Sequence, residues 1–170
     1  QYHFSDGEKI KGPMDFSSKN FMSLKDQHAF MKQIVFPESV PNDRRLALSD
    51  DDYSLLYREM SILPRQSKYP KYKSSYYDGY CKFFMYGDSR DTIPDHIKIL
   101  NKVGQAYGFI LDNAYIIDLE NKVEFILTAV VYHNNNETIN DNNYEYESIS
   151  IPFLAKLGRL IHNFEQDRTK

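Results

Sequence analysis

The sequence lacks several residue types and patterns, and each absence excludes a class of protein. A single cysteine, Cys81, allows no disulfide within the chain. The 21 Lys and Arg residues against 24 Asp and Glu give a net charge of −3, without the basic surplus of a dedicated nucleic-acid binder. No apolar run approaches the roughly 18 residues that span a bilayer. We therefore expect no internal disulfide, no nucleic acid as partner and no membrane span.

Tryptophan is also missing, and the chain opens on Gln1 with neither an initiator Met nor a signal-like N-terminus. We interpret the 170 residues as a cut piece of a longer protein and as a single domain or most of one. Tyrosine is abundant, with 14 residues, and 11 phenylalanines accompany it. This composition suits half-buried strands and wet grooves.

The first third of the chain predicts a loop and a helix. Residues 1–20 are polar and contain turn residues, so we expect a loop there. Ser23 is a plausible N-cap, because Asp26 stands three residues later in the capping-box position. Apolar residues then follow at near-helical spacing until Pro37 ends the helix.

A second helix is predicted between Ser49 and Pro64. Three aspartates, 50–52, follow the Ser49 cap, where the helix dipole favours negative charge. The next segment, about 65–95, is rich in tyrosine and lysine. We interpret it as an insertion folded over the two helices. Tyrosines beside cations also stack sugars or bases, so a role at a substrate entrance stays open.

The second half of the chain predicts an antiparallel sheet. Strands are expected at about 97–104, 108–118 and 123–132, with a short hairpin joining the last two. The third strand is apolar on both faces, which predicts a position in the middle of a sheet with layers on each side. The predicted fold class is therefore α+β, a three-stranded meander over 97–132 covered by helices.

A C-terminal helix over 151–166 completes this single domain of residues 1–170. Its apolar positions follow helical spacing, and we expect it to pack across the strands through Phe153, Leu157, Ile161 and Phe164.

The triplet Lys102-Val103-Gly104 stands at the predicted end of the first strand. A Lys-x-Gly triplet is weak evidence alone, so the flanking segments matter: 99–108, 112–118, 123–125, 140–146 and 152–159. With these segments, and with the order helix, helix, insertion, meander and terminal helix, the chain resembles the C-terminal half of the class A β-lactamase-like and penicillin-binding transpeptidase-like serine hydrolases. More narrowly, it resembles the β-lactamase-related serine hydrolases of Bacteroidetes-type bacteria.

The resemblance implies the C-terminal half of a β-lactamase-like fold in an exported bacterial protein, periplasmic or extracellular. It implies acyl transfer to serine and hydrolysis of an amide, ester or peptidoglycan-type substrate, without a cofactor. The nucleophile would lie in the N-terminal half of the same protein, since no serine of this chain has a lysine three residues later. The chain also lacks Ser-Asp-Asn and Glu-x-x-Leu-Asn.

Site residues follow from the same resemblance. Lys102 would face the serine and the substrate carboxylate, and the backbone N–H of Gln105 would supply half of an oxyanion hole. Val103, Gly104 and Ala106 would contact substrate, although Val103 lacks the hydroxyl that Thr or Ser offers. Without the resemblance, Lys102 is a lysine that caps a strand end.

Other candidate sites have plainer interpretations. The five histidines lack metal-ligand spacing, so no metal site is expected. Asp112 and Asp118 share one strand face, where an acid–base pair is conceivable but hairpin or buried polar roles are favoured. Two alternatives to the hydrolase remain open: a non-enzymatic binding module of the same architecture that contacts polysaccharide or protein, and an unrelated α+β domain in which Lys-Val-Gly is accidental.

Overall fold

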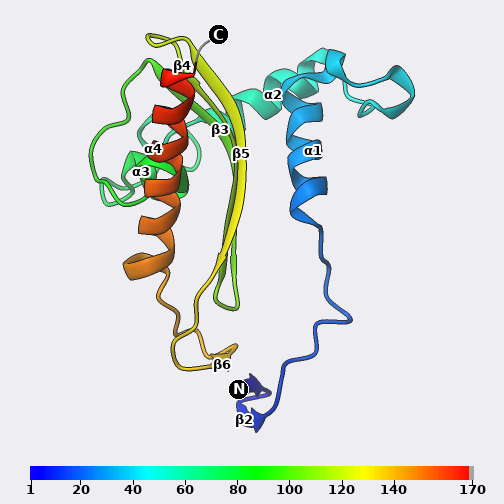
Figure 1. The fold of residues 1–170 in the computed structure, drawn as a ribbon, viewed down its shortest axis with the longest axis vertical. Helices are drawn as coiled ribbons and strands as arrows, with labels where there is room; N and C mark the ends of the chain where they lie inside the picture. The colour runs from blue at the N-terminus through cyan, green and yellow to red at the C-terminus, as the bar shows by residue number, and fades with distance from the viewer. Residues whose placement is uncertain (169–170) are drawn as a thin grey trace.

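A three-stranded antiparallel sheet forms the centre of the computed structural model, which describes residues 1–168 (Figure 1). Its strands are β3 (Ile97–Ala106), β4 (Phe109–Asp118) and β5 (Val123–Tyr132), in the spatial order β3-β4-β5. The predicted meander is confirmed. The predicted mid-sheet position of 123–132 is wrong, because β4 is central and β5 is an edge strand. The apolar faces of β5 are covered instead by α4 and α1.

Helix α4 (Ile151–Asp167) covers one face of the sheet and continues a π-helical turn, η5 (Tyr146–Ser150). The predicted helix-on-sheet packing is confirmed, but the expected contact residues are partly wrong. Phe153 and Phe164 are 53% and 62% exposed, and Leu157 and Ile161 are half-buried. The buried flank of the helix is Ile151, Leu154, Ala155 and Gly158. Apolar residues occupy more than half of the helix circumference, so spacing alone did not identify the flank of closest approach.

The later part of the predicted 65–95 insertion contributes to this core, whereas most of residues 65–77 are exposed. Its regular pieces are η3 (Pro64–Gln66), η4 (Asp78–Cys81) and the irregular segment α3 (Phe83–Tyr86). Phe83, Phe84 and Met85 are buried and pack with Ile110, Ile116 and Leu154 in the main hydrophobic core. The segment around α3 therefore lies between helix α4 and the sheet.

Gly158 allows α4 to approach α3 closely. A Cβ atom at Gly158 would lie 2.6 Å from the Met85 nitrogen and 2.9 Å from Phe84 Cβ. Helix propensity alone would favour alanine by about 1 kcal/mol, but the backbone clash opposes it. We expect Gly158→Ala to lower the free energy of unfolding by about 1–3 kcal/mol, as overpacked cores do, measured by urea denaturation. Gly104→Ala is the matched control, because a Cβ there meets only Leu111, at 3.9 Å; equal losses for the two variants would contradict this account.

The other sheet face meets α1 (Leu24–Val35) and α2 (Asp50–Ser61), joined by η1 (Pro37–Ser39) and η2 (Asn42–Arg44). Both predicted N-caps are confirmed, because the hydroxyls of Ser23 and Ser49 accept hydrogen bonds from the third backbone N–H of their helices. A second, smaller core joins these helices to the sheet through Met31, Leu100 and Tyr115. In Figure 1, α1 runs beside only one half of the length of the strands.

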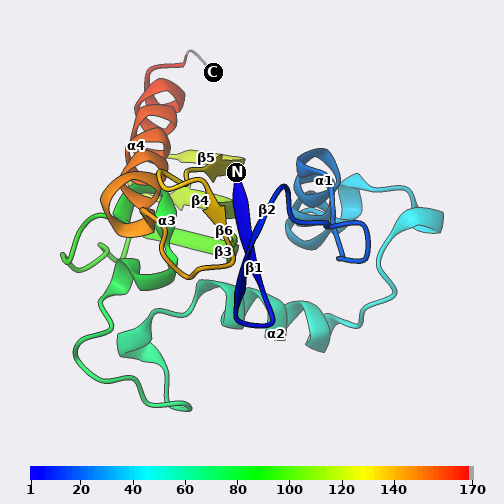
Figure 2. The ribbon, with the colours of Figure 1, turned by 90° about the horizontal axis from the view of Figure 1, so that it is seen from below.

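The N-terminal residues form a hairpin, so the predicted loop over 1–20 is partly wrong. Strand β1 (Tyr2–Ser5) pairs antiparallel with β2 (Glu8–Lys11) and parallel with β6 (Thr138–Ile139). Asp6 and Gly7 both have positive φ at the turn, and Asp-Gly is a strong two-residue hairpin signal. Figure 1 shows this hairpin below the end of the sheet, and Figure 2, seen from below, shows it between the strands and α1.

Asp118 organises the turn between β4 and β5, as its favoured hairpin role predicts. Its carboxylate accepts hydrogen bonds from the Asn121 side chain (2.8 Å) and from the backbone N–H groups of Glu120 and Asn121. It also lies 2.8 Å from Nε2 of His162 on α4. Burial alone would raise the pKa of Asp118, but the Asn121 and His162 interactions outweigh it and lower the pKa to about 2.

The free energy of unfolding should therefore fall in acid as the Asp118 carboxylate becomes protonated. A depressed pKa stabilises the fold above the unfolded value of about 3.9, and the contribution disappears as pH falls towards 2. The shift corresponds to about 2 kcal/mol. We expect the difference in unfolding free energy between wild type and Asp118→Asn to shrink by about that amount between pH 5 and pH 2, by chemical denaturation. A difference independent of pH would contradict the assignment.

Candidate functional site

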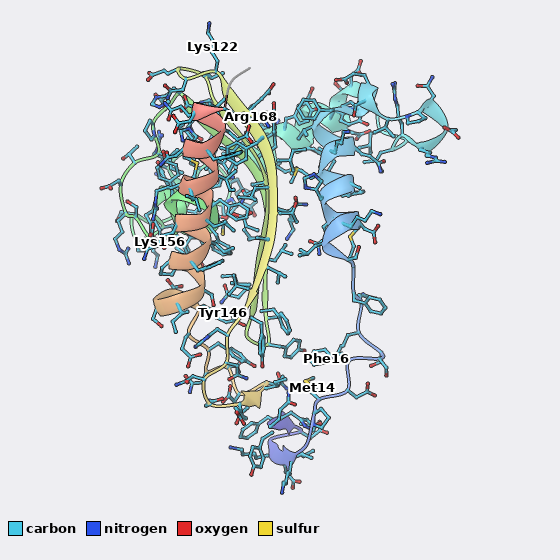
Figure 3. The ribbon with its side chains drawn as sticks, in the orientation of Figure 1. Met14, Phe16, Lys122, Tyr146, Lys156 and Arg168 are labelled. Atoms are coloured by element: carbon cyan, nitrogen blue, oxygen red, sulfur yellow. The ribbon has the colours of Figure 1, made fainter. Side chains whose placement is uncertain are left out.

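The largest cleft lies on the sheet face that α1 leaves uncovered. Its volume is about 1150 Å³. One wall is the sheet surface near the β3–β4 turn, and the other is the extended stretch that leads from the N-terminal hairpin to α1. Met14 and Phe16 project from this stretch towards the turn, where the Phe16 ring contacts Tyr107 edge-on at 5.2 Å (Figure 3). The cleft therefore joins segments that are far apart in sequence.

Apolar side chains dominate the cleft, and its charge is positive. Phe21 is 92% exposed on one wall, and Phe109 and Tyr132 are about half exposed on the other. Lys102 and Lys19 supply ammonium groups, and no described residue in the lining is acidic. The cleft thus suits a ligand with an apolar body and a negative charge.

Lys102 is exposed and lines this cleft, as its predicted role requires, although it is not at the strand end because β3 continues to Ala106. Its ammonium donates to the backbone carbonyl of Val103 at 2.7 Å. Lys98 is also exposed on β3, at an even spacing from Lys102 and hence on the same face, but it lies outside the cleft. The pair offers a matched comparison.

The backbone N–H of Gln105 points to the open edge of β3. Backbone groups of an antiparallel edge strand point alternately to and from the neighbouring strand. The Leu119 N–H donates to the His96 carbonyl and so extends the β3–β4 hydrogen-bond ladder beyond Ile97. The Ile97 N–H instead points away from β4 and donates to the Pro94 carbonyl. Gln105 lies an even number of residues after Ile97, so its N–H is directed away from β4. A donor at a free strand edge beside a cleft has the placement of an oxyanion-hole group.

The three predicted substrate contacts, Gly104, Ala106 and Val103, differ in how far they are exposed to the cleft. Gly104 leaves open space over the strand, since an added Cβ would meet nothing closer than 3.9 Å. Ala106 is exposed and lines the cleft. Val103 borders the cleft, but it is half-buried and packs against the main core. A hydroxyl at position 103 would therefore belong partly to the core, which the sequence did not reveal.

A buried polar cluster lies behind Lys102, and its members Lys82 and Asn101 were not anticipated from the sequence. Lys82, Asn101 and Asp112 are 5%, 8% and 0% exposed. The Lys82 ammonium donates to Asn101 Oδ1 (2.7 Å) and to the backbone carbonyl of Met60 (2.6 Å). Asn101 Nδ2 donates to Asp112 Oδ1 (2.9 Å), and the Phe84 N–H donates to the other Asp112 oxygen (3.1 Å).

The electrostatics of this cluster favour two opposite charges at neutral pH. Burial raises the pKa of Asp112 to about 6, against hydrogen bonds from Asn101 and the Phe84 N–H and the charge of Lys82. Burial lowers the pKa of Lys82 to about 8, against the charge of Asp112. The Asp112 carboxylate and the Lys82 ammonium are therefore both charged between about pH 6 and pH 8. Asp112 and Asp118 belong to separate buried networks, in agreement with the buried polar roles favoured above.

A smaller pocket of about 220 Å³ lies on the other side of the Lys102 strand. Tyr72 and Tyr80 line it, together with Lys82, Asn101 and Lys102. The rings of Tyr72, Tyr76 and Tyr80 contact one another in series, the first pair tilted and the second edge-on, with centroids 5.2 and 4.7 Å apart. Burial raises the pKa of the neighbouring Cys81 thiol despite the charge of Lys82, which disfavours the thiolate as a nucleophile.

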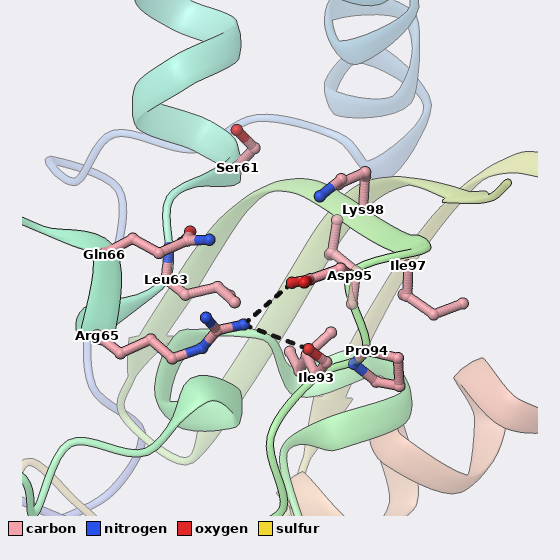
Figure 4. Close-up of a pocket in the computed structure, with 10 residues that line it drawn as sticks. Ser61, Leu63, Arg65, Gln66, Ile93, Pro94, Asp95, Ile97 and Lys98 are labelled. Atoms are coloured by element: carbon pink, nitrogen blue, oxygen red, sulfur yellow. Dashed lines mark hydrogen bonds and ion pairs between the residues drawn. The ribbon is translucent and has the colours of Figure 1, made fainter.

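The polar side chains of another pocket, shown in Figure 4, have a structural role. The Arg65 guanidinium lies 2.9 Å from Asp78 and 3.5 Å from Asp95, and it also donates to the Ile93 carbonyl (3.4 Å). These interactions satisfy Arg65 and tie the segment after α2 to the start of β3. We assign it no binding role.

No family model, curated protein or solved structure matches this chain. Within residues 1–168, no helix combines the length and the apolar character needed to cross a membrane.

Proposed function

We propose that the chain is the substrate-presenting part of a serine hydrolase that works by acyl transfer on an amide, ester or peptidoglycan-type substrate. The observation that supports this most is the free edge of β3. It presents Lys102, open space over Gly104 and the outward N–H of Gln105 along a cleft without acidic lining.

The chemistry would proceed in two steps. A serine oxygen attacks the acyl carbonyl and loses its proton to a base, and the Gln105 N–H donates to the carbonyl oxygen as negative charge develops there. The tetrahedral intermediate collapses, the leaving group takes a proton and departs, and an ester to serine remains. Water then attacks this ester and releases the acid. Lys102 would hold the anionic group of the substrate throughout and keep the site positive.

The serine and its base would come from an N-terminal part of the same protein. Two surfaces besides the cleft support such a partner. The outer edge of β5 has no paired strand among the described residues, and it carries none of the lysines or prolines that commonly protect an edge. Helix α4 and the turn before it also expose an apolar stripe at helical spacing: Ile149, Phe153, Leu160 and Phe164.

Active-site labelling of the full-length protein tests the proposal. A fluorophosphonate and a fluorescent penicillin should both label one serine in a Ser-x-x-Lys sequence N-terminal to Gln1, and peptide mapping identifies it. The chain of residues 1–170 alone is the matched control and should remain unlabelled. Absence of labelling in the full-length protein, or labelling of a serine within residues 1–170, would contradict the proposal.

The tyrosine series favours a second candidate, a binding module that contacts polysaccharide. Tyr72, Tyr76 and Tyr80 are each more than a third exposed, beside a lysine-rich stretch. If this is the function, Tyr72→Ala should reduce retention on an immobilised polysaccharide at least tenfold. Tyr69→Ala should not, because Tyr69 is 96% exposed and lies outside the series. Equal retention by the two variants excludes this candidate.

A further inference from the structure

Three segments of the fold meet at the side chain of Lys82. Its ammonium bridges the Met60 carbonyl at the end of α2 and the Asn101 side chain on β3. Lys82 itself follows η4, the last turn before α3. One buried group therefore connects α2, the tyrosine- and lysine-rich segment, and the strand that carries Lys102.

Asn101 links the Lys82 ammonium to the edge strand β3. Its Oδ1 accepts from Lys82, while its Nδ2 donates to Asp112 and to the Cys81 carbonyl (2.7 Å). The amide orientation is therefore determined by donors and acceptors on both sides. Lys102 is the next residue along the strand, so its backbone position follows that of Asn101.

We propose that Lys82 is a positioning residue that fixes the Lys102–Gln105 edge of β3 relative to α2 and the segment before α3. Its consequence for catalysis rests on the proposed function. Replacing the ammonium removes both of its hydrogen bonds, so the position of the edge relative to α2 is less constrained, although its pairing with β4 remains. Misplacement by about 1 Å can reduce a catalytic rate about 100-fold.

A pH titration distinguishes this role from a packing role. The charged and titratable groups around Lys82 are Asp112 on β4 and the residues that line the same pocket: Glu59, Tyr72, Asp78, Tyr80, Cys81 and Lys102. Because burial lowers the pKa of Lys82 to about 8, the amide NMR signals of residues 102–105 should titrate with a midpoint near pH 8. Cys81→Ser removes a nearby group that raises the pKa of Lys82, so it should lower the midpoint without abolishing the titration.

The test compares Lys82→Met, which keeps the side-chain length without the charge, with Lys98→Met, which removes an exposed lysine of β3. The titration should disappear in Lys82→Met and persist in Lys98→Met. If Lys82→Met does not fold, Lys82→Met/Asp112→Asn removes both charges together and should show the same loss. A titration near pH 8 that persists without Lys82, or that is absent from the wild type, would overturn the proposal.

The activity arm uses the full-length protein. Lys82→Met, or the double variant, should lower kcat about tenfold or more with little change in KM, and Lys82→Arg should restore part of it. Unchanged kcat would overturn the positioning role. A wild type without hydrolase activity, combined with the expected NMR result, would contradict the proposed function and leave the structural coupling intact.

Discussion

Replacing Asp112 with alanine is expected to reduce the free energy of unfolding by about 3–5 kcal/mol, the range observed when one of two opposite buried charges is removed; Asn101 bridges the two charges here. The variant leaves the buried Lys82 ammonium without an opposite charge, and it removes the acceptor of Asn101 and of the Phe84 N–H. Alanine also leaves a cavity at a fully buried position. Urea denaturation at pH 7 measures the loss.

Two comparisons test whether this loss of unfolding free energy comes from the buried charges. Asp91→Ala removes an exposed carboxylate that is hydrogen-bonded only to Ser89 among residues 1–168, and it should cost less than about 1 kcal/mol. The deficit of Asp112→Ala should also shrink as pH rises towards 8, because loss of the Asp112 charge lowers the pKa of Lys82 further and the variant loses the Lys82 charge before wild type does. A loss near that of Asp91→Ala would show that the buried pair does not support the core.

Replacing Lys102 with alanine in the full-length protein is expected to lower the rate of acylation by about two to three orders of magnitude, comparable to removal of one preorganised electrostatic group. The ammonium is the charged group of β3 that lies within the cleft, and the sheet does not need it, because the side chain is exposed. The unfolding free energy should therefore change by no more than about 0.5 kcal/mol. Hydrolysis of a chromogenic ester and acylation by a fluorescent penicillin measure the rate.

Lys98→Ala is the control for that experiment. It removes the same charge from the same face of the same strand, outside the cleft, so it should retain nearly full activity. Parallel losses in the two variants would indicate a general effect of net charge. Full activity in Lys102→Ala would return Lys102 to the alternative interpretation, an ordinary surface lysine.

Val103→Thr should be tolerated, although its half-buried side chain limits how far a hydroxyl reaches the cleft.

Local signals in the sequence were sufficient for much of the fold. The meander follows from apolar runs, one of them apolar on both strand faces, and from a short connection, and both N-caps follow from Ser23 and Ser49. These features depend on neighbours within a few residues. The N-terminal hairpin was missed although its Asp6-Gly7 signal is equally local, because the surrounding residues are polar and short of apolar alternation.

Features that depend on distant partners were not predictable. Phe153 and Phe164 have the hydrophobicity of a buried flank, but Gly158 determines where α4 approaches α3. Lys82 looks like one of several cations in a tyrosine-rich segment, and only the fold brings it to Asn101 and Asp112. The position of Lys102 in a cleft was expected from resemblance, whereas the outward direction of the Gln105 N–H required the strand register.

The most direct test of the central claim is a crystal structure of the full-length protein with a boronic acid bound covalently to the reactive serine. We expect the boronate oxygen to accept a hydrogen bond from the Gln105 N–H at about 2.7–3.1 Å, with the rest of the inhibitor along Gly104 and its anionic group towards the Lys102 ammonium. An inhibitor bound away from β3, with Lys102 directed into solvent, would contradict the account.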